Sequence, residues 1–149
     1  MIVRSPTAIL IVDANIILRA VMGRSFGQLL PAATDRRTIR TTHRAMREIY
    51  GVMRGRGLAD ALHVAALART MTFVTVEPAA AYEALEEKAA HILCEAPQSR
   101  NGSTNDAHIL ALAWALDADI WSHDRDFAGT GWPSWSSANL AAALSAEAA

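Results

Sequence analysis

The chain has 149 residues, of which 52% are hydrophobic and 19% are charged. This composition excludes a disordered protein, and the length fits one compact domain over residues 1–149. The N-terminal apolar run 8–12 is too short for a membrane span, which needs about 20 residues. The only cysteine, Cys94, excludes an internal disulfide and a cysteine-based zinc site, so we expect a cytoplasmic protein.

Charge is divided unevenly along the chain. Residues 1–56 carry ten arginines against three acidic residues, whereas residues 57–149 carry four basic and twelve acidic residues. An arginine-rich half is suited to bind a polyanion or an acidic partner. Alternatively, the two halves interleave in the fold and the opposite charges form ordinary surface pairs. Charge alone leaves both interpretations open.

Short strands alternate with helices along the whole chain. In chain order, the elements predicted as far as residue 76 are a strand over 8–12, helices over 14–22 and 26–33, a strand over 38–41, helices over 42–54 and 58–70, and a strand over 72–76. The elements predicted beyond it are a helix over 78–95, a loop over 96–103, a helix over 106–116 capped by Thr104 or Asn105, a strand over 119–122, an edge strand over 133–136 and a helix over 138–144. This alternation predicts an α/β fold, a three-layer α/β/α sandwich around a mostly parallel sheet.

Four acidic positions stand out because of where they lie in the predicted elements. Asp13 ends the first strand, and Asp124 and Asp126 follow the fourth. Glu48 lies near the buried face of a predicted helix, and Asp106 opens the most apolar helix. Because ligands of open α/β sheets bind beyond the carboxyl ends of the strands, we expect three of these acidic segments to reach the same edge of the sheet.

Carboxylates brought together repel one another, and Mg²⁺ or Mn²⁺ relieves that repulsion because both ions prefer hard oxygen ligands. Such ions can orient a water for attack on a phosphodiester. The acids also have structural interpretations. Asp13 can cap the following helix, and Glu48 can pair with Arg44, four residues earlier. Asp106 can interact with the helix dipole, and Asp126 can belong to a turn.

Four segments resemble the PIN-domain family, in particular its VapC-like toxin branch. They are 11–15 (IVDAN) with an Asp-x-Asn signature, 47–49 (REI) around a single helical Glu, 105–113 (NDAHILALA), and 120–127 (IWSHDRDF), in which a Thr or Ser precedes x-Asp-x-Asp-Phe. Ser122 stands where Thr is commoner in the family. The order, type and spacing of the four segments match, and the resemblance covers nearly the whole chain.

The resemblance implies an α/β/α sandwich with Mg²⁺- or Mn²⁺-dependent endoribonuclease activity. The implied acidic quartet is Asp13, Glu48, Asp106 and Asp124, with Asp126 as an accessory acid. The three aspartates of the quartet would hold the first metal, and its glutamate would bind a second metal or position the attacking water. Asn15 and Ser122 would orient the carboxylates. The family further implies the toxin of a toxin–antitoxin pair, and a homodimer.

Arginines of the first half are the predicted contacts for RNA or for an acidic antitoxin, and the sequence does not separate these uses. They are Arg40, Arg44, Arg47 and Arg54. Trp132 and Trp135 can stack on bases, line a dimer surface or simply pack against the core. His123 can touch the substrate or be solvated.

Two other functions stay open. The same metal site can act on another phosphate ester, including DNA, and a comparison of substrates in one buffer distinguishes this case. Alternatively, the chain is a non-catalytic binding module whose acids are only caps and ion pairs. That module would show no dependence on divalent ions.

Overall fold

The structure is a computed structural model that describes residues 4–23, 28–95, 104–123, 127 and 129–149. The strands within these residues are β1 (Ile9–Val12), β2 (Thr38–Thr42), β3 (Val74–Glu77), β4 (Asp119–Trp121) and β5 (Ser134–Trp135). The helices are α1 (Ala14–Val21), α2 (Leu29–Ala33), α3 (His43–Gly55), α4 (Ala61–Met71), the 3-10 turn η1 (Ala79–Ala81), α5 (Glu83–Glu95), α6 (Ala107–Leu116) and α7 (Ser137–Ala148). Each predicted strand and helix is present, several with shifted ends.

In the described part of the chain the strands form a five-stranded sheet in the order β3-β2-β1-β4-β5, and every neighbouring pair is parallel. Strand β1 is central, because Leu10 pairs with Ile39 on one side and with Asp119 on the other. Leu10, Ile11 and Val12 are fully buried, as expected for an apolar strand covered on both faces. The predicted α/β fold is confirmed, with a sheet that is parallel throughout.

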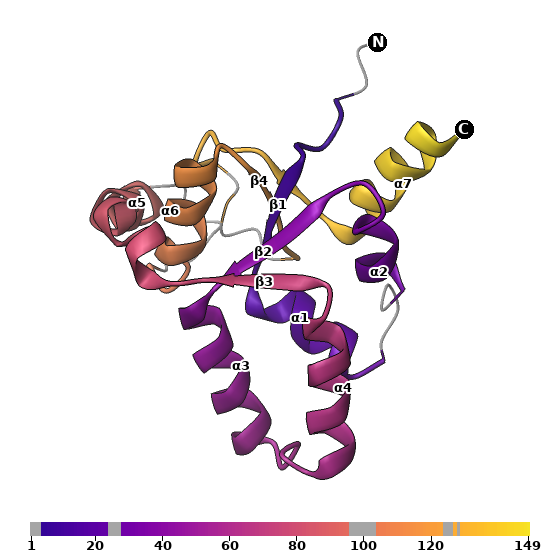
Figure 1. Ribbon diagram of the computed structural model, residues 1–149. Coiled ribbons are helices and arrows are strands. Elements are labelled where there is room, and N and C mark those ends of the chain that lie inside the picture. Colours follow the sequence, from indigo (N-terminus) through magenta and orange to yellow (C-terminus); the bar gives the residue numbers. More distant parts are fainter. Residues whose placement is uncertain (1–3, 24–27, 96–103, 124–126, 128) are drawn as a thin grey trace.

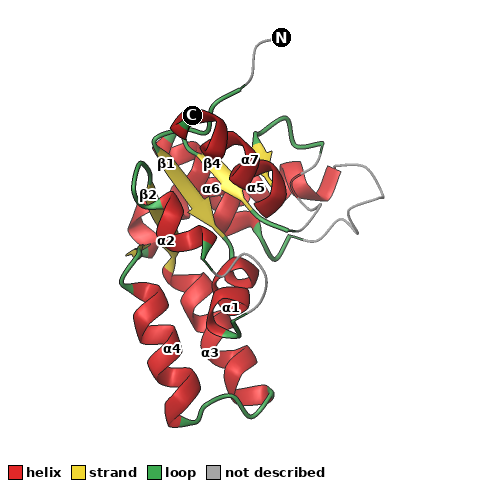
Figure 2. Cartoon of the chain, turned by 90° about the vertical axis from the view of Figure 1, so that its right-hand side faces the viewer, coloured by secondary structure: helices red, strands yellow, loops and turns green. Residues whose placement is uncertain are grey.

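Helices cover both faces of the sheet and the edge where the strands end. Helices α5 and α6 lie on one side of the sheet, and α2 and α7 lie on the other (Figure 1). Helices α1, α3 and α4 gather beyond the ends of β1 and β2 in both views (Figure 1, Figure 2). Helix α1 contacts both α3 and α4. This third group of helices surrounds the edge at which the sequence places the acidic residues.

Helix α6 is the centre of the core. Its residues from Ala107 to Ala113 are all buried, because α6 packs against β1, β2 and β4 on one side and against α5 on the other. A helix that is apolar on all sides is stable in water only when it is covered in this way. His108 is the one polar residue within the buried run. No helix in the described part of the chain is both long and apolar enough to cross a membrane.

The helix predicted over 78–95 is divided at Tyr82 into η1 and α5. The backbone of Tyr82 has φ −139°, outside the helical range, and its side chain is only 1% exposed. The Tyr82 hydroxyl forms a hydrogen bond with Nδ1 of His43, 2.6 Å away. A tertiary contact therefore interrupts a segment that is helical by local preference.

Side-chain caps explain two other shifted ends. Helix α4 begins at Ala61 rather than near residue 58, because Asp60 accepts a hydrogen bond from the N–H of His63 (3.0 Å). Helix α7 begins where the Ser136 hydroxyl accepts from the N–H of Asn139 (3.2 Å), and it extends beyond residue 144 to Ala148. The short helix predicted over 26–33 is seen as α2, and residues 26 and 27 lie outside the described ranges.

Candidate active site

Asp13 and Ser122 form the centre of the candidate active site. They directly follow β1 and β4, which are neighbours in the sheet, and both residues are buried. The Ser122 hydroxyl donates a hydrogen bond to Oδ2 of Asp13. Strands β2 and β3 lie on one side of β1, and β4 and β5 lie on the other. The order of the strands therefore reverses at β1, and Asp13 lies at this topological switch point, where α/β sheets bind ligands.

Asp13 also caps helix α1, as its structural interpretation expected. Its Oδ1 accepts the backbone N–H of Ile16 (3.2 Å). An ionised carboxylate offers about four lone-pair sites, so a role as helix cap does not by itself exclude a role as metal ligand. The cap and the contact with Ser122 fix the carboxylate in one orientation. Capping and ligand binding are therefore compatible roles for the same side chain.

Asp106 lies at the same edge of the sheet, at the start of α6. Helix α6 leads into β4 and runs opposite to the strands, so its first residues lie where the strands end. Asp106 occupies the N-cap position, and the prediction that Thr104 or Asn105 caps this helix is wrong. The Asp106 side chain makes no capping hydrogen bond and is partly exposed. Its carboxylate is therefore not required to close the helix end.

Glu48 lies in the second turn of α3, which starts at the carboxyl end of β2. The buried stripe of this helix is Ala45, Ile49 and Met53, and Glu48 lies beside it, near the buried face as expected, with its side chain exposed. Arg44, which was a possible helical partner, forms an ion pair with Glu86 of α5.

Asp124 and Asp126 lie outside the described residues. Among the residues that the structure does describe, no three acidic, histidine or cysteine side chains form a cluster that would hold a metal ion. The structure brings Asp13 and Ser122 into contact, and it places Asp106 and Glu48 on helices that begin at the same edge without gathering them into one ligand set. The candidate donors are all carboxylates, which fits Mg²⁺ or Mn²⁺ better than zinc.

A buried polar contact beside Asp106 was not predicted. Nδ1 of His108 lies 2.7 Å from Oγ1 of Thr42, and both side chains are buried. Burial, followed by the nearby charge of Arg44, lowers the pKa of His108 to about 4. His108 is therefore neutral near pH 7, and we assign Nδ1 as the acceptor of the Thr42 hydroxyl. A single histidine inside an apolar helix was the sequence signal for this contact.

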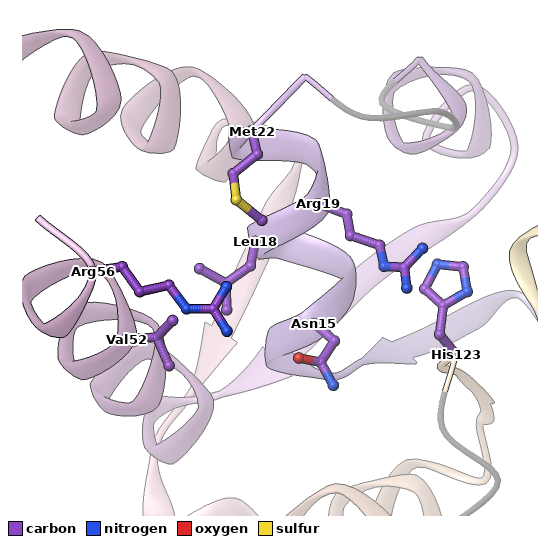
Figure 3. Close-up of a pocket in the computed structure, with 7 residues that line it drawn as sticks. All are labelled: Asn15, Leu18, Arg19, Met22, Val52, Arg56 and His123. Atoms are coloured by element: carbon purple, nitrogen blue, oxygen red, sulfur yellow. The ribbon is translucent and has the colours of Figure 1, made fainter. Parts of the chain in front are cut away.

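A groove of about 410 Å³ opens between α1 and α3 (Figure 3). The described residues that line it are Asn15, Leu18, Arg19, Met22, Val52, Arg56 and His123. Asn15, which was predicted to orient the carboxylates, is exposed at the start of α1, and His123 directly follows Ser122. Arg19 and Arg56 were not predicted as site residues, because the approach of α1 to α3 is a tertiary feature.

Ion pairs join arginines of the first half to acids of the second half. The pairs are Arg4–Asp119, Arg37–Glu147, Arg40–Glu77 and Arg44–Glu86. The interpretation of the charge asymmetry as interleaved surface pairs therefore holds for these four arginines. Arg40 and Arg44, two of the predicted RNA or partner contacts, already have carboxylate partners. Arg47 and Arg54 are exposed on α3.

Trp132 and Trp135 pack against the core. The indole N–H of Trp132 donates to the carbonyl of Ala118, and that of Trp135 donates to Oδ2 of Asp119, both at 2.8 Å. The guanidinium of Arg4 lies 5.2 Å from the centre of the Trp135 ring. These contacts favour the packing interpretation over an open platform for bases.

Comparison with known structures shows the same fold in several proteins of low sequence identity. A chain of VapBC2 from Rickettsia felis, a structure bound to a DNA fragment from their promoter, has a TM-score of 0.61 at 16% identity and covers 86% of this chain and 98% of its own. PAE2754 from Pyrobaculum aerophilum has a TM-score of 0.62 at 13% identity, with 92% and 96% covered. VapC20 from Mycobacterium tuberculosis, a sarcin-ricin loop cleaving toxin, has a TM-score of 0.60 at 24% identity, with 83% and 95% covered.

Comparison with curated proteins gives no significant match. The family model of the PIN domain, however, matches residues 11–145, which include the second half of β1, Asp13 and all of the later strands in the described part of the chain. The family suggested by the four sequence segments is therefore confirmed. This chain belongs to the PIN domain family.

Proposed function

We propose that the protein is a divalent-metal-dependent endoribonuclease that hydrolyses RNA phosphodiesters. The observation that carries this proposal is the buried Asp13 carboxylate at the switch point of a PIN-domain sheet, held by Ser122 and by the amide of Ile16. VapC20, one of the similar structures, is a sarcin-ricin loop cleaving toxin, which supports RNA as the substrate class.

The residues proposed to hold Mg²⁺ or Mn²⁺ are Asp13, Asp106 and Asp124. Glu48 would bind a second ion or position the attacking water, and Asp126 would be an accessory acid. When bound, such an ion supplies an activated water and stabilises the leaving oxygen. The proposed reaction is direct attack of that water on phosphorus, without a covalent enzyme intermediate. Carboxylates suit this task because they are hard, charged oxygen ligands.

The chain's own contribution is to orient these ligands in advance. Ser122 and the N–H of Ile16 hold the two oxygens of Asp13, and burial protects both hydrogen bonds from water. A ligand that is already oriented loses little conformational freedom on binding, which raises its affinity. Asn15 is exposed in the first turn of α1, two residues after Asp13. We propose that its side chain orients a carboxylate or the substrate phosphate.

We also propose that the protein is the toxin of a type II toxin–antitoxin pair, that it binds an antitoxin protein, and that it forms a homodimer. The likeness to VapBC2 supports a partner of the antitoxin kind. Exposed apolar side chains also support a protein partner, since Leu62 and Val64 on α4 are 72% and 52% exposed. Light scattering of the purified chain, of mass 16.0 kDa, distinguishes a dimer from a monomer.

The test is cleavage of a mixture of structured RNAs with Mg²⁺, with Mn²⁺ and with EDTA. We expect cleavage only with a divalent ion, and loss of cleavage in Asp13→Asn, which removes a ligand charge at nearly constant shape. Asp119→Asn is the matched control, because Asp119 is also a buried carboxylate but follows the turn that enters β4 at the opposite edge of the sheet.

Three results would contradict the proposal. Retained cleavage in Asp13→Asn would refute the metal-site assignment. Equal cleavage of DNA of the same sequence would favour a broader phosphodiesterase. Absence of cleavage, together with no rise in melting temperature on addition of Mn²⁺, would favour a non-catalytic binding module.

A further inference from the structure

We infer that the groove between α1 and α3 binds one nucleotide of the RNA strand, next to the phosphate that is cut. Arg19 and Arg56 contact backbone phosphates, and the apolar floor between them contacts the base or the ribose. This inference rests on the proposed function, since it names where the substrate lies relative to the acidic site.

The groove begins at the candidate active site. Asn15 is two residues from Asp13, and His123 is adjacent to Ser122, which donates to Asp13. From Asn15, the lining residues of α1 follow at positions 18, 19 and 22, which is one face of a helix. A strand of RNA that leaves the acidic site along α1 therefore enters the groove.

The charge of the groove favours an anion. Arg19 comes from α1 and Arg56 from the end of α3, and both are exposed. Among the described residues that line the groove, none is acidic. No ion pair joins Arg19 or Arg56 to a carboxylate in the described part of the chain, in contrast to Arg40 and Arg44. The guanidinium fork of arginine binds phosphate oxygens in pairs.

The floor of the groove is apolar. Leu18 of α1 and Met22, which follows that helix, lie between the two arginines, and Val52 of α3 lies beside Arg56 (Figure 3). An apolar floor flanked by a few charged groups is typical of small-ligand sites of about 300–1,000 Å³, and the groove falls within this range. A nucleotide presents both kinds of group, because its phosphates are charged and its base has apolar faces.

An acidic protein segment is the other macromolecule that two arginines attract. RNA is favoured because the groove is continuous with the acidic site, which a substrate strand must cross. The acids of that site repel a polyanion, and arginines immediately beside them offset the repulsion. An acidic peptide needs no contact with the acidic site, so its affinity does not depend on a groove placed beside that site.

The test is binding of a fluorescent single-stranded RNA of mixed sequence, measured by anisotropy in EDTA, so that no cleavage occurs. Arg19→Gln and Arg56→Gln are compared with Arg69→Gln, an exposed arginine of α4 that does not line the groove. We expect each groove variant to bind about tenfold more weakly. The slope of log Kd against log salt should fall by about 0.7 for each arginine lost. Arg69→Gln should change neither quantity.

Met22→Gln tests the apolar floor, because it replaces a partly exposed side chain with a polar one of similar length. It should weaken binding of the same RNA without changing the salt slope, since no phosphate contact is lost. Unchanged affinity and slope in both arginine variants, with cleavage by the wild-type protein intact, would overturn the groove assignment and leave the proposed function standing. Binding of poly-glutamate as tight as that of RNA would reassign the groove to an acidic partner. Absence of RNA binding and cleavage by the wild-type protein would refute the proposed function itself.

Discussion

The hydroxyl of Thr42 joins two helices that carry candidate acids. It lies 2.7 Å from Nδ1 of His108, and the same oxygen accepts the N–H of Ala45 at 2.9 Å. Thr42 thus caps α3, which carries Glu48, and contacts the first turn of α6, which begins after Asp106. One small buried side chain therefore sets the relative position of two parts of the acidic site.

Thr42→Val removes both hydrogen bonds while the shape of the side chain is conserved. We expect a loss of about 1–3 kcal/mol in the free energy of unfolding, because α3 loses its cap and the ring nitrogen of His108 loses its donor. Urea denaturation measures this loss. Thr42→Ser should recover most of the stability, and Thr75→Val on the exposed side of β3 should have little effect. Full stability of Thr42→Val would show that the contact is not structural.

The depressed pKa of His108 predicts a specific pH dependence of stability. The ordinary pKa of histidine is 6.5, and that of His108 in the folded chain is about 4. Between these two pH values the unfolded chain binds a proton at His108 that the folded chain does not bind. The contribution of the buried neutral ring is therefore complete above pH 6.5 and is lost progressively as the pH falls towards 4. The size of the effect is about 3 kcal/mol at most.

His108→Asn should remove this dependence, because an amide oxygen can accept the Thr42 hydroxyl but does not titrate. Urea denaturation at pH 5 and pH 7, both in EDTA, measures the difference between wild type and variant. His91→Asn is the control, since His91 is exposed on α5. An equal loss of stability between pH 7 and pH 5 in wild type and His108→Asn would contradict the assignment.

Ser122 offers a separate test of how Asp13 is oriented. Ser122→Ala removes the hydroxyl that donates to Oδ2 of Asp13, while the N–H of Ile16 still donates to Oδ1. We expect Mn²⁺ affinity, measured by calorimetry, to fall by about 10- to 100-fold, the range for lost partners of metal ligands. Ser122→Thr keeps the hydroxyl and should restore the affinity. An unaffected affinity in Ser122→Ala would show that the serine supports only the fold.

Local sequence patterns were sufficient to predict the central strand and the residue that follows it. The apolar run 8–12 reads as a strand covered on both faces, and its end fixes the position of Asp13 at the sheet edge. Tyr82 shows where local patterns fail. The residues around it favour helix, and only its distant contact with His43 breaks the helix. Such contacts carry no periodic signal.

The arginines show the same limit at the candidate site. Arg40 and Arg44 appear available in the sequence, yet each pairs with a glutamate about forty residues later, at positions 77 and 86. Arg19 and Arg56, which line the groove, are separated in sequence and meet only because α1 packs on α3. Charge type is readable from the chain, but the partner of each charge depends on the tertiary fold.

Asp119 is also a buried carboxylate, but its contacts are those of a residue that stabilises the fold. Its Oδ2 accepts from the Arg4 guanidinium at 2.7 Å, from the Trp135 indole at 2.8 Å and from the N–H of Thr7 at 3.3 Å. Asp119→Asn retains an acceptor oxygen but loses the charge, so we expect a loss of about 1–2 kcal/mol in the free energy of unfolding. The loss is moderated because the Arg4 side chain is 49% exposed and keeps its hydration.

Cleavage by the folded fraction of Asp119→Asn should equal that of the wild type, whereas Asp13→Asn should fold with nearly unchanged stability and lose cleavage. Asparagine at position 13 still accepts the N–H of Ile16, and its amide can donate to the Ser122 oxygen. Melting curves and cleavage rates are measured in parallel for the two variants. We expect a lower melting temperature only in Asp119→Asn and a loss of cleavage only in Asp13→Asn. If Asp119→Asn instead abolished cleavage at full stability, the acidic site would have been assigned to the wrong edge of the sheet.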